Sequence, residues 1–123
     1  MSLNIDLCEI ADKGAEMEFR HPGTLESMGI FATVRGYDSE AVVEAGRAVS
    51  QAMMAAPKSD VQDFARKKRV AMAQAALVSV RGGPDDVDAV RAMMAEPGKV
   101  WIVEQVQAFG GDRASLFPKP ETP

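Results

Sequence analysis

Gly14–Glu40 reads GAEMEFRHPGTLESMGIFATVRGYDSE and contains the strand patterns of the chain. Its first part alternates apolar and charged residues, the period-two pattern of a half-buried strand. A second part, about residues 29–35, alternates in the same way. The residues on the apolar faces of the two strands are Ala15, Met17, Phe19, Ile30, Ala32 and Val34. The pattern therefore predicts two strands that each bury one face.

The segment between these strands contains a turn, His21-Pro22-Gly23-Thr24. Proline fixes φ, and glycine permits the positive φ that several turn types require. Strands so close in sequence form an antiparallel hairpin most economically, and we expect one at about residues 14–35. An isolated hairpin is marginal in water and needs a partner to pack on.

Helices supply that partner in the rest of the chain. Asp38-Ser39 offers an N-cap, and apolar residues then recur at helical spacing. Proline and glycine divide this region into four expected helices: one to about Ala56 before Pro57, one capped by Ser59 and running to about Val80, one from Pro84 to before Pro97, and one at Val100–Phe109 ended by Gly110-Gly111. Residues 1–13 fit a short helix or an irregular arm.

The predicted fold class is α+β and mostly helical, an N-terminal β-hairpin followed by a bundle of about four helices. We expect a single domain over residues 1–117, with helices at about 39–110. The tail 118–123 contains three prolines and is expected to be disordered.

Composition places the chain among soluble globular proteins, with 123 residues, 46% of them hydrophobic and 26% charged. A net charge of −4 argues against a dedicated nucleic-acid binder. No apolar run approaches the roughly 20 residues of a membrane span, and no signal peptide is recognisable. The single cysteine, Cys8, fits a reducing compartment. We therefore expect a cytoplasmic protein that contacts neither membrane nor nucleic acid.

The sequence contains few residues that are arranged for catalysis or metal binding. His21 is the only histidine and lies in a turn, without a partner at metal spacing. The Asp85, Asp86 and Asp88 cluster lacks the rest of a calcium loop, and a helix N-terminus explains its charge. The basic residues Arg66–Arg69 point to different sides of a helix, and Asp63 is spaced to form ion pairs with them. We therefore expect a solvent-exposed, salt-bridged face here, in preference to a binding site for an acidic protein or for nucleic acid. We expect no enzyme activity, no catalytic residues, no metal and no cofactor.

Adjacent methionines near the ends of two expected helices are the strongest candidates for partner binding. AMMAAP at Ala52–Pro57 recurs as AMMAEP at Ala92–Pro97. Flexible thioethers repack against varied surfaces, although methionine at helical spacing is also ordinary core. Neighbours on a helix lie 100° apart, so one of each pair can face inward and the other outward. The candidate binding residues are Met53, Met54, Met93, Met94 and the only tryptophan, Trp101, for which core anchoring and an interface role both stay open.

The two ends of the chain together resemble the small tail assembly chaperones of long-tailed phages. The hairpin region contributes Gly14, Pro22 and Thr24, and Asp38-Ser39 follows at the helix start. The stretch VWIVEQVQAFGGDRASLF at Val100–Phe117 contributes the rest of the match: Glu104-Gln105-Val106, Ala108-Phe109 and Gly111-Asp112-Arg113-Ala114. These positions are expected to form the fold rather than an active site.

The resemblance implies a non-enzymatic protein of the bacterial host cell that binds the tape measure protein and recruits tail tube subunits during phage or prophage tail assembly. The turn HPGTLES departs from the family's usual turn, which leaves open a structural or tail-completion protein of the virion. A small inhibitor or adaptor that binds a host protein is a further alternative. Self-association into a homo-oligomer would suit a protein that coats a tape measure, and nothing in the sequence requires it.

Overall fold

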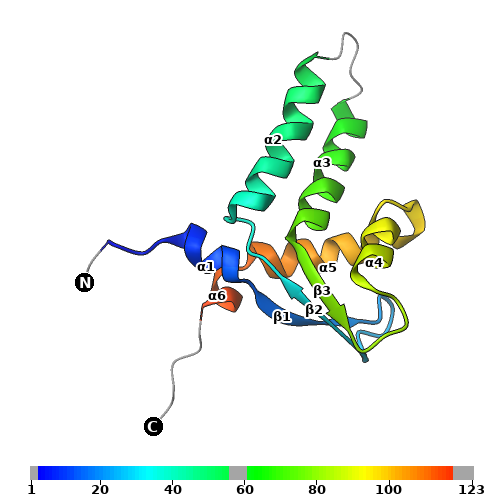
Figure 1. Cartoon of the computed structure of the whole chain (residues 1–123). Coiled ribbons are helices and arrows are strands. Elements are labelled where there is room, and N and C mark those ends of the chain that lie inside the picture. The colour runs from blue at the N-terminus through cyan, green and yellow to red at the C-terminus, as the bar shows by residue number, and fades with distance from the viewer. Residues whose placement is uncertain (1–2, 56–60, 118–123) are drawn as a thin grey trace.

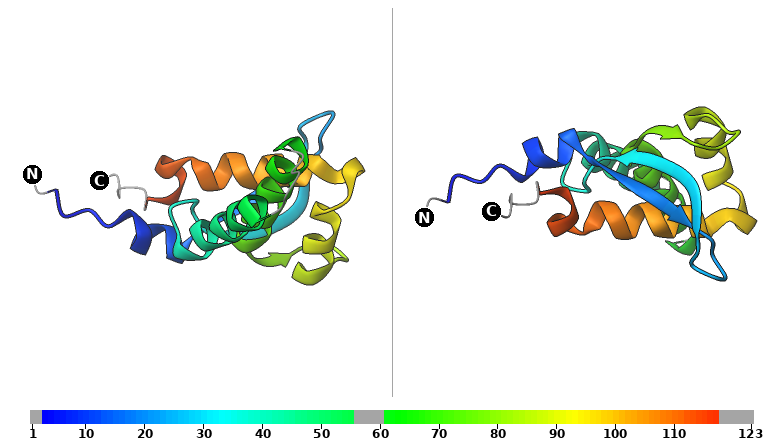
Figure 2. Two further views of the ribbon diagram at one scale, coloured as in Figure 1. Left: turned by 90° about the horizontal axis from the view of Figure 1, so that it is seen from above. Right: turned by 90° about the horizontal axis from the view of Figure 1, so that it is seen from below.

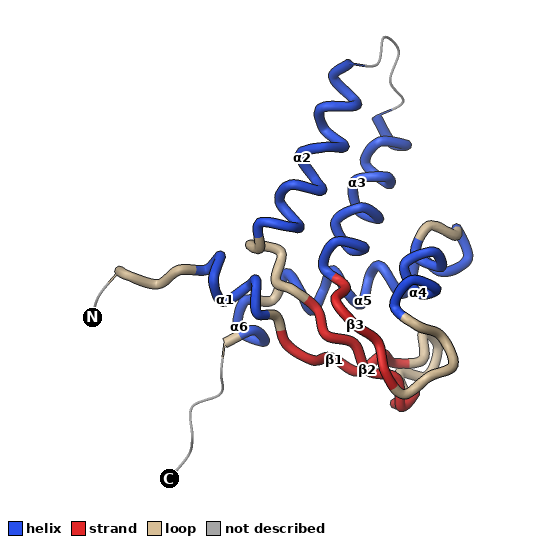
Figure 3. The backbone as a smooth tube through the Cα atoms, viewed as in Figure 1, coloured by secondary structure: helices blue, strands red, loops and turns tan. Residues whose placement is uncertain are grey.

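The computed structural model describes residues 3–55 and 61–117 of the chain. Figure 1 shows a small sheet with helices packed around it and one pair of helices projecting away from it. Figure 3 shows the same arrangement by type of secondary structure. The elements are α1 (Leu7–Lys13), β1 (Ala15–Arg20), β2 (Ser27–Val34), α2 (Glu40–Ala55), α3 (Val61–Ala76), β3 (Leu77–Arg81), α4 (Val87–Met94), the 3-10 turn η1 (Pro97–Lys99), α5 (Val100–Gly111) and α6 (Arg113–Leu116). The expected class is confirmed: α+β, mostly helical, with N-terminal strands followed by helices.

The predicted hairpin is present, and its strands bury the predicted faces. β1 pairs with β2 in antiparallel register, with Ala15 opposite Val34 and Met17 opposite Ala32. Met17, Ala32 and Val34 are all buried, whereas Glu16 on the other face is exposed. The alternation arises because successive strand residues point to opposite sides of the sheet.

A third strand was not predicted. We expected a helix to continue to about Val80, but α3 ends at Ala76 and β3 pairs antiparallel with β2. Arg35 stabilises the helix end: its backbone N–H donates to the Ala76 carbonyl at 2.8 Å and its Nη1 donates to the Ala75 carbonyl at 3.1 Å. These bonds satisfy carbonyls that a helix terminus leaves unpaired. The segment LVSVR then completes the sheet, with Leu77 buried and the neighbouring Val78 exposed.

The other helices follow the prediction with shifts at their ends, except for the short helix α6, which was not predicted. Ser39 is the residue that caps α2, since its buried Oγ accepts from the Val42 N–H. α4 begins three residues after Pro84, because the Asp86 side chain caps it by accepting from the Ala89 N–H at 2.8 Å. α5 continues to Gly111 instead of ending at Phe109. The N-terminal segment is a helix, α1, capped by its preceding Asp6. The predicted stop at Pro57, the cap at Ser59 and the disordered tail 118–123 lie outside the described residues.

The core lies between the sheet and α5, with contributions from the bases of α2 and α3 and from α4. Figure 2 shows α5 running beside the strands. The largest fully buried side chains here are Leu77, Met94, Val34, Val42, Val103 and Val106. Gly110 lets α5 approach the loop before α2, because a Cβ there would lie 2.6 Å from the Tyr37 ring. The Tyr37 N–H donates to the Gly110 carbonyl at 2.8 Å across the same contact.

Candidate protein-binding pocket

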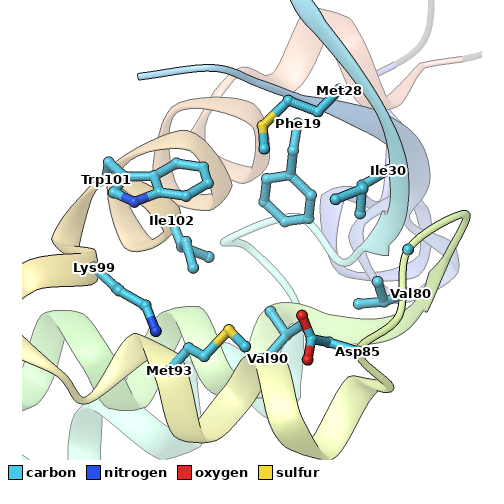
Figure 4. Close-up of a pocket in the computed structure, with 11 residues that line it drawn as sticks. Phe19, Met28, Ile30, Val80, Asp85, Val90, Met93, Lys99, Trp101 and Ile102 are labelled. Atoms are coloured by element: carbon cyan, nitrogen blue, oxygen red, sulfur yellow. The ribbon is translucent and has the colours of Figure 1, made fainter. Parts of the chain in front are cut away.

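An apolar pocket of about 240 Å³ opens where the sheet, α4 and α5 meet. Figure 4 shows its walls, which come from segments far apart in the sequence. The lining residues are Phe19, Met28, Ile30, Val80, Gly83, Asp85, Val90, Met93, Lys99, Trp101 and Ile102. Each strand contributes to one side, and the two helices with their connecting turn supply the other. The pocket therefore exists only in the folded chain.

The floor of the pocket is fixed by buried apolar side chains. Phe19, Val90 and Ile102 are all nearly inaccessible to solvent. Trp101 meets Phe19 edge to face, with ring centroids 6.4 Å apart and planes at 86°. Aromatic pairs favour this arrangement because the positive edge of one ring meets the negative face of the other. The pocket floor is thus rigid and preformed.

The mouth of the pocket is more adaptable. Met28 is 37% exposed, and Met93 is half-buried on the opposite side. Both thioether side chains point toward the open space in Figure 4. The two charged lining residues, Asp85 and Lys99, lie at the edge, and the Lys99 Nζ pairs with Glu96 at 3.3 Å. Flexible methionines over a fixed aromatic floor suit varied apolar side chains.

The structure separates the predicted binding residues into three environments. Met93 and Trp101 line the pocket together. Met94 is 1% exposed and belongs to the core, so it offers no surface to a partner. Met53 lines a different groove between α2 and α3, and the adjacent Met54 is 84% exposed. We expected one methionine of each pair to face inward and the other outward. For Met93 and Met94 this holds only in part, because Met94 is buried but Met93 is half-buried and not fully exposed.

The remaining candidate groups, His21, Asp88 and Cys8, lie outside the pocket. His21 Nδ1 accepts from the Gly23 and Thr24 N–H groups at 3.1 and 3.2 Å, which holds the hairpin turn. Asp88 pairs with Arg91 at 3.1 Å on α4. Cys8 is exposed, and desolvation followed by the nearby Asp12 carboxylate raises the pKa of its thiol. A raised pKa disfavours the reactive thiolate.

Residues 3–55 and 61–117 contain neither a candidate metal site nor a candidate membrane span. Within these ranges, no three His, Cys, Asp or Glu side chains are grouped so as to hold a metal ion. No helix in the described part of the chain has the length and hydropathy to cross a bilayer.

Sequence reasoning missed the strand side of the pocket. Met28, Ile30 and Val80 come from β2 and from the strand that was expected to be helical. The alternation at Ile30 placed it on the apolar face, but no local signal shows that this face meets α4. Only the tertiary arrangement brings Met28 opposite Met93.

Comparison of the chain with protein-family models, with curated proteins and with solved structures gives no match.

Proposed function

We propose that this protein is a non-enzymatic tail assembly chaperone of a long-tailed phage or prophage. It acts in the cytoplasm of the bacterial host, where it binds the tape measure protein and tail tube subunits during tail morphogenesis. We take these clients from the family that the hairpin and the C-terminal helix resemble. The observation that carries a binding role is the apolar pocket, with methionines at its mouth and Trp101 in its wall.

The pocket supports protein binding in preference to a small ligand. Its volume of about 240 Å³ falls below the roughly 300–1,000 Å³ usual for small-molecule sites. An apolar side chain projecting from a client helix needs less room and gains affinity by leaving water. A tape measure protein, as a long helical client, presents such side chains repeatedly, so a shallow site with adaptable walls can engage many of them.

A binding experiment with matched variants tests this proposal. The bait is the full chain, and the prey is the tape measure protein encoded in the same genome, co-expressed with it. Met28→Asp places a charge at the pocket mouth. Val78→Asp is the control, because Val78 is also a strand residue, is also 37% exposed, and does not line the pocket.

We expect the unmodified chain and Val78→Asp to retain the tape measure protein and Met28→Asp to lose it. Failure of the unmodified chain to retain either the tape measure protein or a tail tube subunit would refute the proposed function. Recovery of the chain as a component of purified phage particles would instead favour the virion structural protein, and capture of host proteins alone would favour the inhibitor or adaptor.

A further inference from the structure

A second surface lies on the pair of helices that projects from the body. We call α2 and α3 together the arm; Figure 1 shows them side by side, leading away from the sheet. The buried residues of the arm are Val42 and Gly46 on α2 and Ala73 and Ala76 on α3. All four lie in the half of each helix nearer the body. The outer half of the arm therefore adds no buried residue to the core, although it retains apolar residues on both helices, among them Met53, Val61 and Phe64.

The apolar side chains of the outer half line a groove between the two helices. This groove has a volume of about 200 Å³ and is lined by Val49, Ser50, Met53, Val61, Phe64, Ala65 and Lys68. Val61 is 66% exposed and Met54, just beside the groove, is 84% exposed. Exposed apolar side chains gathered in one place mark an interaction surface when they have no structural task.

The charge of the arm is opposite to that of the whole protein. α2 and α3 carry five basic residues against three acidic ones, a net charge of +2, whereas the chain carries −4. Asp63 pairs with Arg66 at 3.0 Å and with Lys67 at 2.9 Å. Lys67 also lies over the Phe64 ring, 5.1 Å from its centroid. Among the described residues that line the groove, Lys68 is the one that carries a charge.

From this combination we infer that the outer groove of the arm binds an acidic amphipathic helix of a partner protein. The apolar face of such a helix would cover Val61, Met53 and Phe64. Its carboxylates would face Lys68 at the edge of the groove, where Lys67 stays paired with Asp63. Helix-in-groove binding uses this division between an apolar seam and charged flanks. Nucleic acid fits less well, because the groove floor offers apolar side chains where phosphates would require hydrogen-bond donors.

This inference is independent of the proposed function, because it uses neither the pocket nor the identity of the client. It also predicts the charge of the partner, which the proposed function does not: the partner helix must be acidic. Attraction between opposite charges at the edge of an interface speeds association, and salt weakens this attraction. Burial of apolar side chains in the groove is not screened by salt in this way.

The test uses two synthetic helical peptides with the same leucine face, one with glutamate and one with lysine on the polar face. Each is labelled with fluorescein and titrated with the full-length chain, with anisotropy as the readout. We expect the acidic peptide to bind about tenfold more tightly than the basic one at low salt, and this preference to shrink as salt screens the lysines.

Two pairs of variants locate the site. Val61→Asp should abolish binding of the acidic peptide, whereas Val43→Asp, on the same arm outside the groove, should leave it unchanged. Lys68→Glu should remove the charge preference, whereas Lys13→Glu, on α1, makes the same change in net charge and should preserve it. Circular dichroism of each variant verifies that the helices remain folded.

Several results would overturn the inference. One is equal affinity for the acidic and basic peptides. Another is binding that survives Val61→Asp but is lost in Met28→Asp, since that result places the peptide in the pocket of the body. A third is a labelled oligonucleotide that binds more tightly than the acidic peptide and depends on Lys68, which would make the arm a nucleic-acid site.

Discussion

The arm and the rest of the protein, which we call the body, differ in what their apolar residues do. In the body, the sheet, α4 and α5 bury theirs around Val34, Leu77 and Val106, each of them inaccessible to solvent. In the outer arm, Val61 and Met54 are mostly exposed. Apolar side chains therefore contribute stability in the body and, by our inference, binding surface in the outer arm. What decides between these roles is whether the apolar side of a helix also meets the sheet and α5, which the outer halves of α2 and α3 do not reach.

The largest difference should appear when an apolar side chain is truncated in each region. Leu77→Ala empties a site in the middle of the core and should lower the free energy of unfolding by about 3 kcal/mol. Val61→Ala removes an exposed side chain from the arm and should change the free energy of unfolding by less than about 0.5 kcal/mol. Urea denaturation of both variants measures the two effects. Equal losses would mean that the outer half of the arm is also part of the core.

A smaller effect is expected from two adjacent glycines in α5. Gly110→Ala places a Cβ 2.6 Å from the Tyr37 ring and should destabilise the protein by about 2 kcal/mol. At Gly111 an added Cβ would meet no atom from another part of the described chain within 4 Å, so Gly111→Ala should be neutral or stabilising by up to about 1 kcal/mol. Thermal unfolding of the pair checks the prediction. Equal shifts in Tm would contradict the close approach of α5 to Tyr37.

The smallest effect concerns the ion pair that joins α6 to the start of the arm. Arg113 donates to both carboxylate oxygens of Asp38, at 2.8 and 2.9 Å, and this hydrogen bonding holds the pKa of Asp38 below its ordinary value near 4. A depressed pKa stabilises the fold above the unfolded-state pKa, and this stabilisation is lost as pH falls through the lower folded-state value.

Arg113→Gln should therefore be less stable than the unmodified chain at neutral pH, and the gap should close as pH falls below about 4. Urea denaturation across this pH range measures the gap. A difference that does not change with pH would show that Arg113 acts through packing and not through its charge.

Local patterns in the sequence predicted the hairpin and most helix boundaries, because alternation and caps are encoded by neighbouring residues. They did not predict β3. Leu77 and Val80 continue a helical pattern of apolar residues, and a short apolar run fits a helix or a strand equally well. The strand forms because β2 offers an open edge and Arg35 ends α3, and both contacts lie about 40 residues away in sequence.

The residues of the pocket could be predicted only in part, because contacts between residues far apart in the sequence bring them together. Two of the predicted binding residues, Met93 and Trp101, line the pocket. The sequence could not separate Met94, which packs in the core, from Met93 beside it. Nor could it place Met28 in the same pocket, since more than 60 residues separate Met28 from Met93.

Hydrogen exchange of the chain, alone and bound to the tape measure protein, compares the body and the arm in one experiment. In the free protein, the amides of β2 and α5 should exchange at least about a hundredfold more slowly than those of the outer arm. On binding, protection should increase at the pocket elements β2, α4 and the start of α5. An arm as protected as the body, or a tape measure complex without added protection at the pocket, would contradict the account.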